Sequence, residues 1–321
     1  KNEKFQKKYI KSLSVNYYNQ ITETKLDKFK IGMKYRRLFF LVLLTMTAFA
    51  FNSILARLAI SNQEIGPVSF ALLRLLSGSV ILIIIVVYRL GLNSIFKIRP
   101  NLKGIIGLSL YMVGFHYAYY FLDAGIGAII LFGGVQIIMF SSAIISKENP
   151  SIYNWLGMIT AMIGIFILFL PEDLVLSQPQ NGLMLMLLAA IGWGIYTISG
   201  KSSKDPLITT MSNFIFTLPI IFFNLVIYPD VIKLSFIGFL LAICSGAIMS
   251  ALGYSLWYSI LPFLEKTIAA LVQLLVPVIA LTISILFLNE KLSYVSFLSS
   301  LLIICGVTVG ICAEKLIKKL L

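Results

Sequence analysis

Long apolar stretches alternate with short polar connectors along the chain, after a polar N-terminal segment. A helix needs about 20 mostly apolar residues to cross the hydrocarbon core of a bilayer. Stretches of roughly this length occupy residues 38–58, 66–88, 104–122, 126–145, 153–170, 182–200, 207–228, 235–258, 267–288 and 294–313. The pattern predicts an all-α integral membrane protein with ten transmembrane helices.

The composition agrees with a membrane protein and indicates no enzyme. Of the 321 residues, 59% are hydrophobic and 12% are charged, whereas soluble domains carry about 25% charged residues. The sequence contains no Walker loop, no HExxH motif and a single histidine. Cys244, Cys305 and Cys312 form no CxxC pair and indicate neither a disulfide framework nor a metal site. We therefore predict no catalytic activity, no metal and no cofactor.

The net charge of +13 follows the predicted topology. If the N-terminus is cytoplasmic, the connectors on that side hold 22 of the 26 Lys and Arg residues, and the opposite connectors hold only Lys233 and Lys291. Cytoplasmic connectors of membrane proteins are enriched in Lys and Arg. We therefore predict a multi-pass protein of the cell (inner) membrane with cytoplasmic N- and C-termini. Anionic lipid, not nucleic acid, is the expected neighbour of the basic segments.

These patterns divide the chain into a basic N-terminal tail, two helical halves and a short C-terminal tail, at residues 1–37, 38–170, 171–313 and 314–321. The N-terminal tail is rich in Lys with scattered Tyr and Phe. We expect it to lie against the inner leaflet; the alternative is an arm that binds a partner. Met33 would make a natural start for such a protein, so the residues before it are expected to have no role in transport.

The two halves repeat one pattern. Similar residues recur in the same order, pairing Phe49 with Trp193, Pro67 with Pro206, Glu148 with Glu290 and Gly164 with Gly306. This predicts two five-helix repeats, in which Arg74 corresponds to Asn213. Because five is odd, the repeats must insert with opposite orientations. Inverted repeats with a site near the bilayer midplane are typical of transporters.

Four motifs carry a resemblance to a known family: P67VSFALLR74, A190IGWGIY196, the segment AALVQLLVPVIALTISILFLNEKLS at 269–293 and LLIICGVTVGI at 301–311. With them, residues 38–313 resemble the EamA-type members of the drug/metabolite transporter superfamily. The chain departs from the pattern at Val135, which takes the position of Pro277 in the first half. The resemblance implies a ten-helix metabolite transporter and identifies no substrate.

The expected function is secondary transport of a small molecule across the membrane by alternating access. One deep cation together with many aromatic residues favours an amphipathic substrate, such as an amino acid or a nucleoside-like compound. The alternative is a non-transporting receptor or assembly protein on the same scaffold. The G306VTVG310 motif allows a weak homodimer but is equally explained by packing within a monomer.

Arg74 is the first candidate site residue. It lies about 12 Å below the outer end of its predicted helix, at ~1.5 Å per residue. A charge at this depth is costly and needs a partner. One hypothesis is a structural contact to backbone carbonyls or to Glu64, Asp123, Glu148 or Glu290. The other is attraction of an anionic group on the substrate, since a guanidinium matches a carboxylate.

His116, Tyr120 and Asp123 are spaced i, i+4 and i+7, so they share one face of a helix. This line could bind a polar ligand or move a proton. Alternatively, His116 is a hydrogen-bonded residue between helices and the tyrosines are interface anchors. Asp123 is expected at the outer boundary of the membrane.

Aromatic residues at helical spacing form a third candidate set: Tyr111, Trp193, Tyr196, Tyr254 and Trp257. Such stripes are often packing or belt residues. On helices that correspond by the repeat, they could also line an aromatic, mostly apolar substrate cavity.

Amides near the middle of predicted helices complete the set, at Asn52, Gln136, Asn213 and Gln273. A buried amide must be hydrogen-bonded, so each either bridges helices or touches substrate. Pro277 frees a backbone carbonyl within its helix. The resulting kink either helps to gate the cavity or is a static bend.

Overall fold

The computed structural model describes residues 35–122, 124–168, 180–230, 234–288 and 294–320. The chain divides into two units, Lys1–Leu41 and Val42–Leu321. The first contributes only the start of a helix to the described residues. The following paragraphs concern the second unit.

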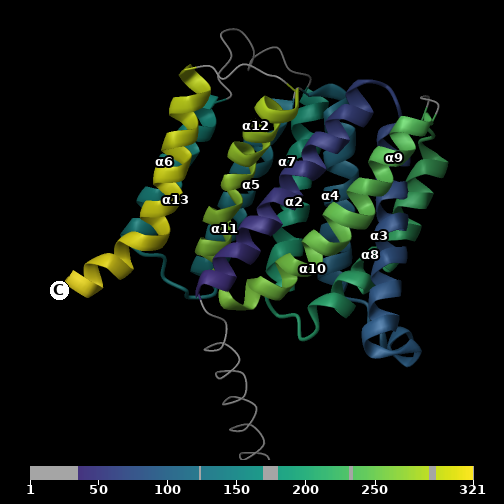
Figure 1. Ribbon diagram of the computed structural model, residues 1–321, viewed down its shortest axis with the longest axis horizontal. Coiled ribbons are helices and arrows are strands. Elements are labelled where there is room, and N and C mark those ends of the chain that lie inside the picture. The colour runs from purple at the N-terminus through teal and green to yellow at the C-terminus, as the bar shows by residue number, and fades with distance from the viewer. Residues whose placement is uncertain (1–34, 123, 169–179, 231–233, 289–293, 321) are drawn as a thin grey trace, which may run out of the picture. The chain divides into compact units, whose positions relative to one another are not determined.

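The described residues are helical throughout, with short turns between the helices (Figure 1). The long helices are α2 (Tyr35–Ser61), α3 (Pro67–Leu90), α4 (Leu102–Phe121), α5 (Ala124–Ile145), α6 (Ile152–Leu168), α7 (Gln180–Gly200), α8 (Pro206–Ile227) and α13 (Tyr294–Leu320). The remaining segments are η1 (Leu92–Lys97), α9 (Phe236–Cys244), η2 (Ser245–Ser250), α10 (Ala251–Ile260), η3 (Leu261–Phe263), α11 (Lys266–Gln273) and α12 (Leu275–Leu288). If α9–η2–α10 and α11–α12 are each taken as one interrupted segment, these elements confirm the ten predicted helical stretches.

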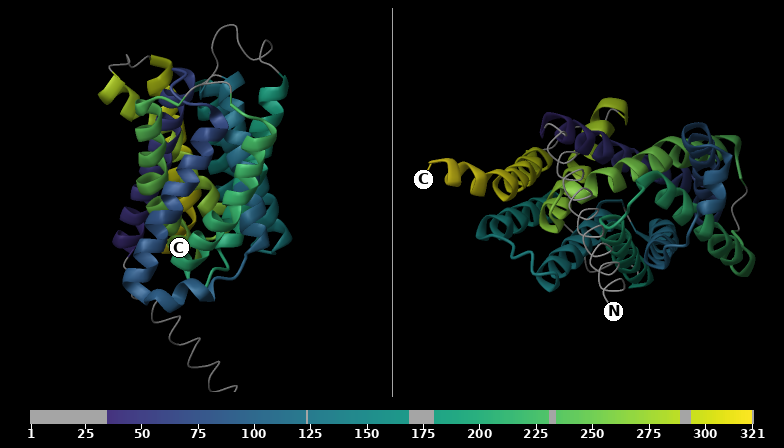
Figure 2. Two further views of the ribbon diagram at one scale, coloured as in Figure 1. Left: turned by 90° about the vertical axis from the view of Figure 1, so that its right-hand side faces the viewer. Right: turned by 90° about the horizontal axis from the view of Figure 1, so that it is seen from below.

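Half of the ten stretches are also long and apolar enough for a bilayer. Among the described residues, five helical spans are long and apolar enough to cross it: Arg37–Ile60, Pro67–Leu90, Gln180–Gly200, Pro206–Ile227 and Phe236–Phe263. Shorter apolar stretches lie at Ile130–Ile145, Ile152–Ile167, Lys266–Ala280 and Phe297–Ile311. Figure 2 shows that most of these helices run along a common direction.

Local sequence signals fix where several helices begin. Asn101 and Asp205 precede α4 and α8, and each side chain accepts a hydrogen bond from a backbone N–H in the first turn. At α3 the cap comes from a distant part of the chain, because Asp230 accepts the N–H of Ser69 at 2.6 Å. Gly66 allows this approach, since a Cβ there would lie 2.1 Å from the Asp230 carboxyl carbon.

Two segments of the second half are interrupted, whereas their counterparts α4 and α5 are continuous. Between α9 and α10, residues Ser245–Ser250 form a π-helical turn. Between α11 and α12, the helix breaks at Leu274. Pro277 accounts for this second break, because proline has no N–H for the carbonyl of Gln273 and its ring crowds that carbonyl. Val135 imposes no such constraint on α5.

Close packing of α6 against α13 agrees with the inverted repeat (Figure 1). A Cβ added to Gly157 would lie 2.5 Å from the carbonyl oxygen of Gly306, and one added to Gly164 would lie 2.8 Å from that of Ser299. The offset of 142 residues pairs Gly157 with Ser299 and Gly164 with Gly306. Each contact is therefore the repeat image of the other, as a pseudo-two-fold axis between these two helices requires.

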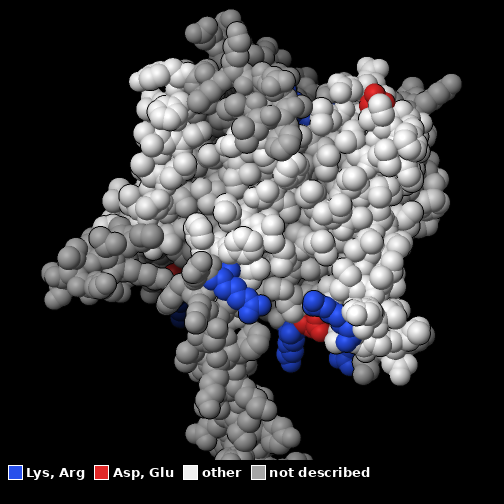
Figure 3. All heavy atoms as spheres, in the orientation of Figure 1, with Lys and Arg blue, Asp and Glu red and all other residues white. Residues whose placement is uncertain are grey.

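Charged side chains gather at one end of the second unit. In Figure 3 most of the visible Lys and Arg side chains lie along the lower edge of the face, and the surface above is mostly uncharged. This is the end at which α3 finishes and α4 begins, as the position of η1 in Figure 1 shows. A broad uncharged band beside a basic edge is typical of a membrane protein.

Candidate functional site

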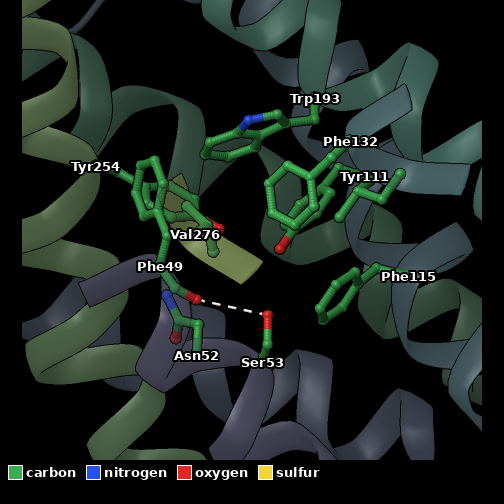
Figure 4. A pocket seen from close by; sticks show the side chains of 10 residues that line it. Phe49, Asn52, Ser53, Tyr111, Phe115, Phe132, Trp193, Tyr254 and Val276 are labelled. Carbon is green, nitrogen blue, oxygen red and sulfur yellow. Dashed lines mark hydrogen bonds between the residues drawn. The ribbon is translucent and has the colours of Figure 1, made fainter. Parts of the chain in front are cut away.

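A small pocket lies among residues from both halves of the chain (Figure 4). Its lining is mostly aromatic and aliphatic: Phe49, Asn52, Ser53, Tyr111, Phe115, Leu131, Phe132, Trp193, Tyr254 and Val276. The water-accessible space inside is about 20 Å³, which is room for roughly one water molecule. The pocket is therefore narrow in this conformation.

Aromatic rings form the walls of this pocket. The ring centroids of Trp193 lie 5.1 Å from Phe49, 5.0 Å from Tyr111 and 5.0 Å from Tyr254. Tyr111 also lies 5.0 Å from Phe115. These separations are within the range in which aromatic pairs attract one another. Rings from α2, α4, α7 and α10 thus surround one volume.

Amide side chains hold the helices around the pocket. Trp193 Nε1 donates to Gln273 Oε1 at 2.6 Å, which ties α7 to the end of α11. The Gln273 Nε2 group donates to the Ala269 carbonyl. Gln136 Nε2 donates to the Ala270 carbonyl at 2.8 Å, which ties α5 to α11. Both glutamines therefore bridge elements beside the broken helix.

Arg74 is completely buried on α3, and its guanidinium contacts polar groups from three other elements, η2, α10 and α4. Its Nε donates to Ser250 Oγ at 2.7 Å and its Nη2 to Tyr254 Oη at 2.6 Å. Nη1 lies 3.4 Å from His116 Nε2. Within the described part of the chain, none of these partners is a carboxylate or a carbonyl. Among the carboxylates that the structural hypothesis named, Glu64 and Glu148 are not among these partners, and Asp123 and Glu290 lie outside the described residues.

The guanidinium lies behind the aromatic wall rather than inside the pocket. Its central carbon is 5.8 Å from the ring centroids of both Tyr111 and Tyr254, which do line the pocket. A cation at this distance from an aromatic ring is attracted to its face. Arg74 therefore acts on the pocket through these side chains in the present conformation.

A second polar link connects Arg74 to the pocket lining. Ser250 Oγ, which accepts from Arg74, also lies 3.2 Å from Asn52 Oδ1. Ser245 Oγ donates to the same oxygen at 2.6 Å. Both serines are fully buried and belong to the π-helical turn η2. The turn thus places two hydroxyls against one amide of α2.

The structure brings most of the predicted site residues together. Asn52, Tyr111, Trp193 and Tyr254 line the pocket, and Arg74, His116, Tyr196, Trp257 and Gln273 contact this lining or one another behind it. Gln136 and Pro277 lie beside the same region on α5 and α12.

Tyr120 is the exception among the described candidates. Its side chain is 62% exposed and packs against Phe121, whereas His116, one turn earlier, is buried. Helical spacing puts the two residues on one face of α4. Other side chains cover this face at His116 but leave it exposed at Tyr120. This corrects the expected placement of Tyr120 in the cluster. Asp123 lies outside the described residues.

Several residues of the site were not among the candidates: Ser53, Phe115, Leu131, Phe132, Ser245, Ser250 and Val276. The apolar ones resemble ordinary membrane residues in the sequence. The small-residue run S245GAIMS250 is a usable signal. Small residues permit close helix approach, and a Cβ on Gly246 would lie 2.1 Å from the Arg74 carbonyl oxygen.

An ionic cluster lies away from the pocket, beyond the end of α5. Glu148 Oε1 accepts from Lys201 Nζ at 2.9 Å, and Glu148 Oε2 accepts from the backbone N–H of Lys266 at 2.8 Å. Partial burial raises the pKa of Glu148, but these two hydrogen bonds and the charges of both lysines outweigh it and lower the pKa below its ordinary value. The cluster ties the end of α5 to α7 and to the start of α11.

Comparisons with known proteins agree with this arrangement. The pattern of the EamA-like transporter family matches residues 37–170 and 180–311. An uncharacterized protein of Pseudomonas aeruginosa is 38% identical over 258 residues, covering 80% of this chain and 88% of that protein. The uncharacterized transporter YoaV of Bacillus subtilis is 25% identical, with 76% and 87% covered.

One crystal structure, whose description names no particular protein, has a similar fold. It superposes with a TM-score of 0.71 and covers 86% of this chain and 98% of its own. The sequence identity is 17%, so the match concerns the fold alone.

Proposed function

Because the chain belongs to the EamA-like transporter family, we propose that it is a secondary transporter that moves a small amphipathic metabolite by alternating access. In this proposal residues 38–170 and 171–313 are the two repeats, and both termini are cytoplasmic. The substrate has an aromatic or aliphatic part and at least one polar group, as an amino acid or a nucleoside-like compound does.

One observation carries the proposal: the two halves of the chain share the aromatic pocket. Phe49, Asn52 and Tyr111 come from the first half, and Trp193 and Tyr254 from the second. Small-molecule sites are usually apolar with a few polar groups that fix orientation. In inverted-repeat transporters, such a site lies between the repeats, which rock around it.

The small volume of the pocket fits a conformation without substrate. About 20 Å³ of water-accessible space is too small for a metabolite, so substrate binding must move the aromatic side chains apart. The interrupted segments are the natural places for such movement, because their backbone already departs from α-helical bonding at η2 and at Leu274. We propose that the break at Pro277 serves this gating.

The experiment that tests this function is flux in proteoliposomes. Purified protein is first screened by thermal shift against amino acids and nucleosides, since a bound ligand stabilises the folded state by mass action. The best stabilising compound is then loaded on one side of the vesicles, and its movement is followed. Uptake above that of empty vesicles is expected. A compound that binds yet never crosses would instead favour the receptor hypothesis.

A further inference from the structure

The Asn52 side chain lines the pocket and carries a buried NH₂ group without a hydrogen-bond partner. The residue is 2% exposed and lines the pocket. Its Oδ1 receives two hydroxyl groups, from Ser245 and Ser250. Its Nδ2 has no hydrogen-bond partner. Buried polar groups in proteins are almost always paired, so an unpaired one calls for an explanation.

Arg74 leaves the hydroxyl hydrogen of Ser250 available to Asn52. A guanidinium can only donate hydrogen bonds, so Ser250 Oγ must accept from Arg74 Nε. The hydroxyl hydrogen of Ser250 is then free to point at Asn52 Oδ1. Ser245 points its own hydrogen at the same oxygen. The carbonyl side of the amide is thereby occupied by two donors, and its NH₂ side is turned away from them. In Figure 4 the Asn52 nitrogen lies on the side of Phe49 and Tyr254.

We propose that Asn52 Nδ2 donates a hydrogen bond to an acceptor on the substrate, a carbonyl or carboxylate oxygen, and thereby determines specificity. Ser250 and Arg74 are positioning residues that hold the amide in this orientation. The inference rests on the proposed function, because it names the polar group that the transported compound carries. If a substrate offers only an ammonium group at this point, its N–H donors face the NH₂ donor of Asn52 and neither has an acceptor.

The buried charge of Arg74 favours the same chemistry. Within the described residues no carboxylate neutralises it, and it stands directly behind the Tyr111 and Tyr254 rings. Its positive potential therefore reaches the pocket and disfavours a cationic ligand. The hydrogen bond from Asn52 and this potential select for an electron-rich oxygen on an apolar or aromatic body.

Three small probes separate the two effects: acetophenone, benzoate and benzylamine. They share one aromatic ring. Acetophenone offers a neutral acceptor and no donor, benzoate offers a charged acceptor, and benzylamine offers donors on a cation. Binding to purified wild-type protein is measured by calorimetry. We expect acetophenone and benzoate to bind at least about tenfold more tightly than benzylamine, as one satisfied buried hydrogen bond allows.

The variant Asn52→Asp replaces the NH₂ donor with an oxygen acceptor. It keeps the shape of the side chain and the oxygen that Ser245 and Ser250 contact. Acetophenone should lose about tenfold in affinity and benzylamine should gain. Loss of acetophenone binding distinguishes the hydrogen bond from attraction by Arg74, since acetophenone is uncharged. An unchanged order of the three probes in this variant overturns the proposal.

The positioning role has its own test in Ser250→Ala. Removing the hydroxyl frees the Asn52 amide to rotate, so the preference for acetophenone over benzylamine should fall by several-fold. The thermal midpoint should also fall below that of the control, because the buried Arg74 Nε loses its acceptor. Ser299→Ala is the matched control, because Ser299 is also a fully buried serine but lies on α13 with no partner for its hydroxyl. Its probe preference should be that of the wild type.

Two further outcomes would contradict the inference: benzylamine bound most tightly by the wild type, or none of the probes bound at millimolar concentration by folded protein. These binding measurements are independent of flux. A protein that shows the expected order but moves no compound into vesicles would refute the transporter function and leave the specificity of Asn52 standing.

Discussion

The continuous helices α4 and α5 differ from their repeat counterparts in the second half, α9–η2–α10 and α11–α12, which are both interrupted. The interruptions lie where polar contacts cross the molecule, since Ser245 and Ser250 reach Asn52 and Gln273 reaches Trp193. One repeated pattern therefore supports two roles. The first-half helices provide regular walls, and the second-half segments place polar groups and leave backbone that can move.

A single repeat pair shows the same division. Arg74 and Asn213 occupy corresponding positions on α3 and α8, and both are completely buried. Arg74 makes polar contacts with Ser250, His116 and Tyr254, whereas Asn213 donates to Tyr258 Oη at 3.2 Å. The site is therefore asymmetric, with its charge on one side of the pseudo-two-fold axis.

The largest expected effect tests that asymmetry. Arg74→Ala removes three polar contacts and leaves the buried hydroxyls of Ser250 and Tyr254 without this donor, so the free energy of unfolding should fall by about 3 kcal/mol or more. Asn213→Ala should cost only about 1 kcal/mol. Denaturant unfolding of both variants in detergent provides the measurement. Equal losses would show that the pair is energetically symmetric.

A smaller pair of effects concerns the helix breaks. Val135→Pro introduces into α5 the break that the second half has, and should destabilise the protein by about 3 kcal/mol. Pro277→Ala should leave stability unchanged or higher but reduce flux several-fold, because the α11–α12 backbone becomes continuous. Thermal stability and proteoliposome flux are compared in the two variants. Undiminished flux in Pro277→Ala would make the break a static bend.

The smallest effect lies in the ionic cluster outside the membrane-spanning segments. Because the pKa of Glu148 is lowered in the folded protein, its contribution to stability is present above the ordinary glutamate pKa and is lost as the pH falls through the lowered value. Partly exposed ion pairs contribute little and are screened by salt. The thermal midpoints of the wild type and Glu148→Gln should therefore differ slightly at neutral pH and converge in acid. A difference that persists in acid would exclude this origin.

Much of the fold could be predicted from the sequence, because apolar length determines which segments cross a bilayer. Aromatic residues of the pocket, such as Trp193 and Tyr254, could be predicted from their spacing. The partners of Arg74 could not be predicted, because the sequence does not show which way the hydroxyl groups of a distant segment point. Nor could the π-helical turn Ser245–Ser250, which depends on how the segment packs against α3. Tyr120 was misplaced because spacing identifies a helix face but not what covers it at each depth.

The proposed transport function requires that the transported compound binds in the shared pocket. Trp193 lies in its wall, so intrinsic fluorescence of the wild type and of Trp193→Phe can be followed while the compound from the thermal-shift screen is added. We predict a fluorescence change in the wild type, with the same concentration dependence as flux, that is absent in Trp193→Phe. A change of equal size in both proteins, or none while flux saturates, would place the binding site elsewhere and contradict the account.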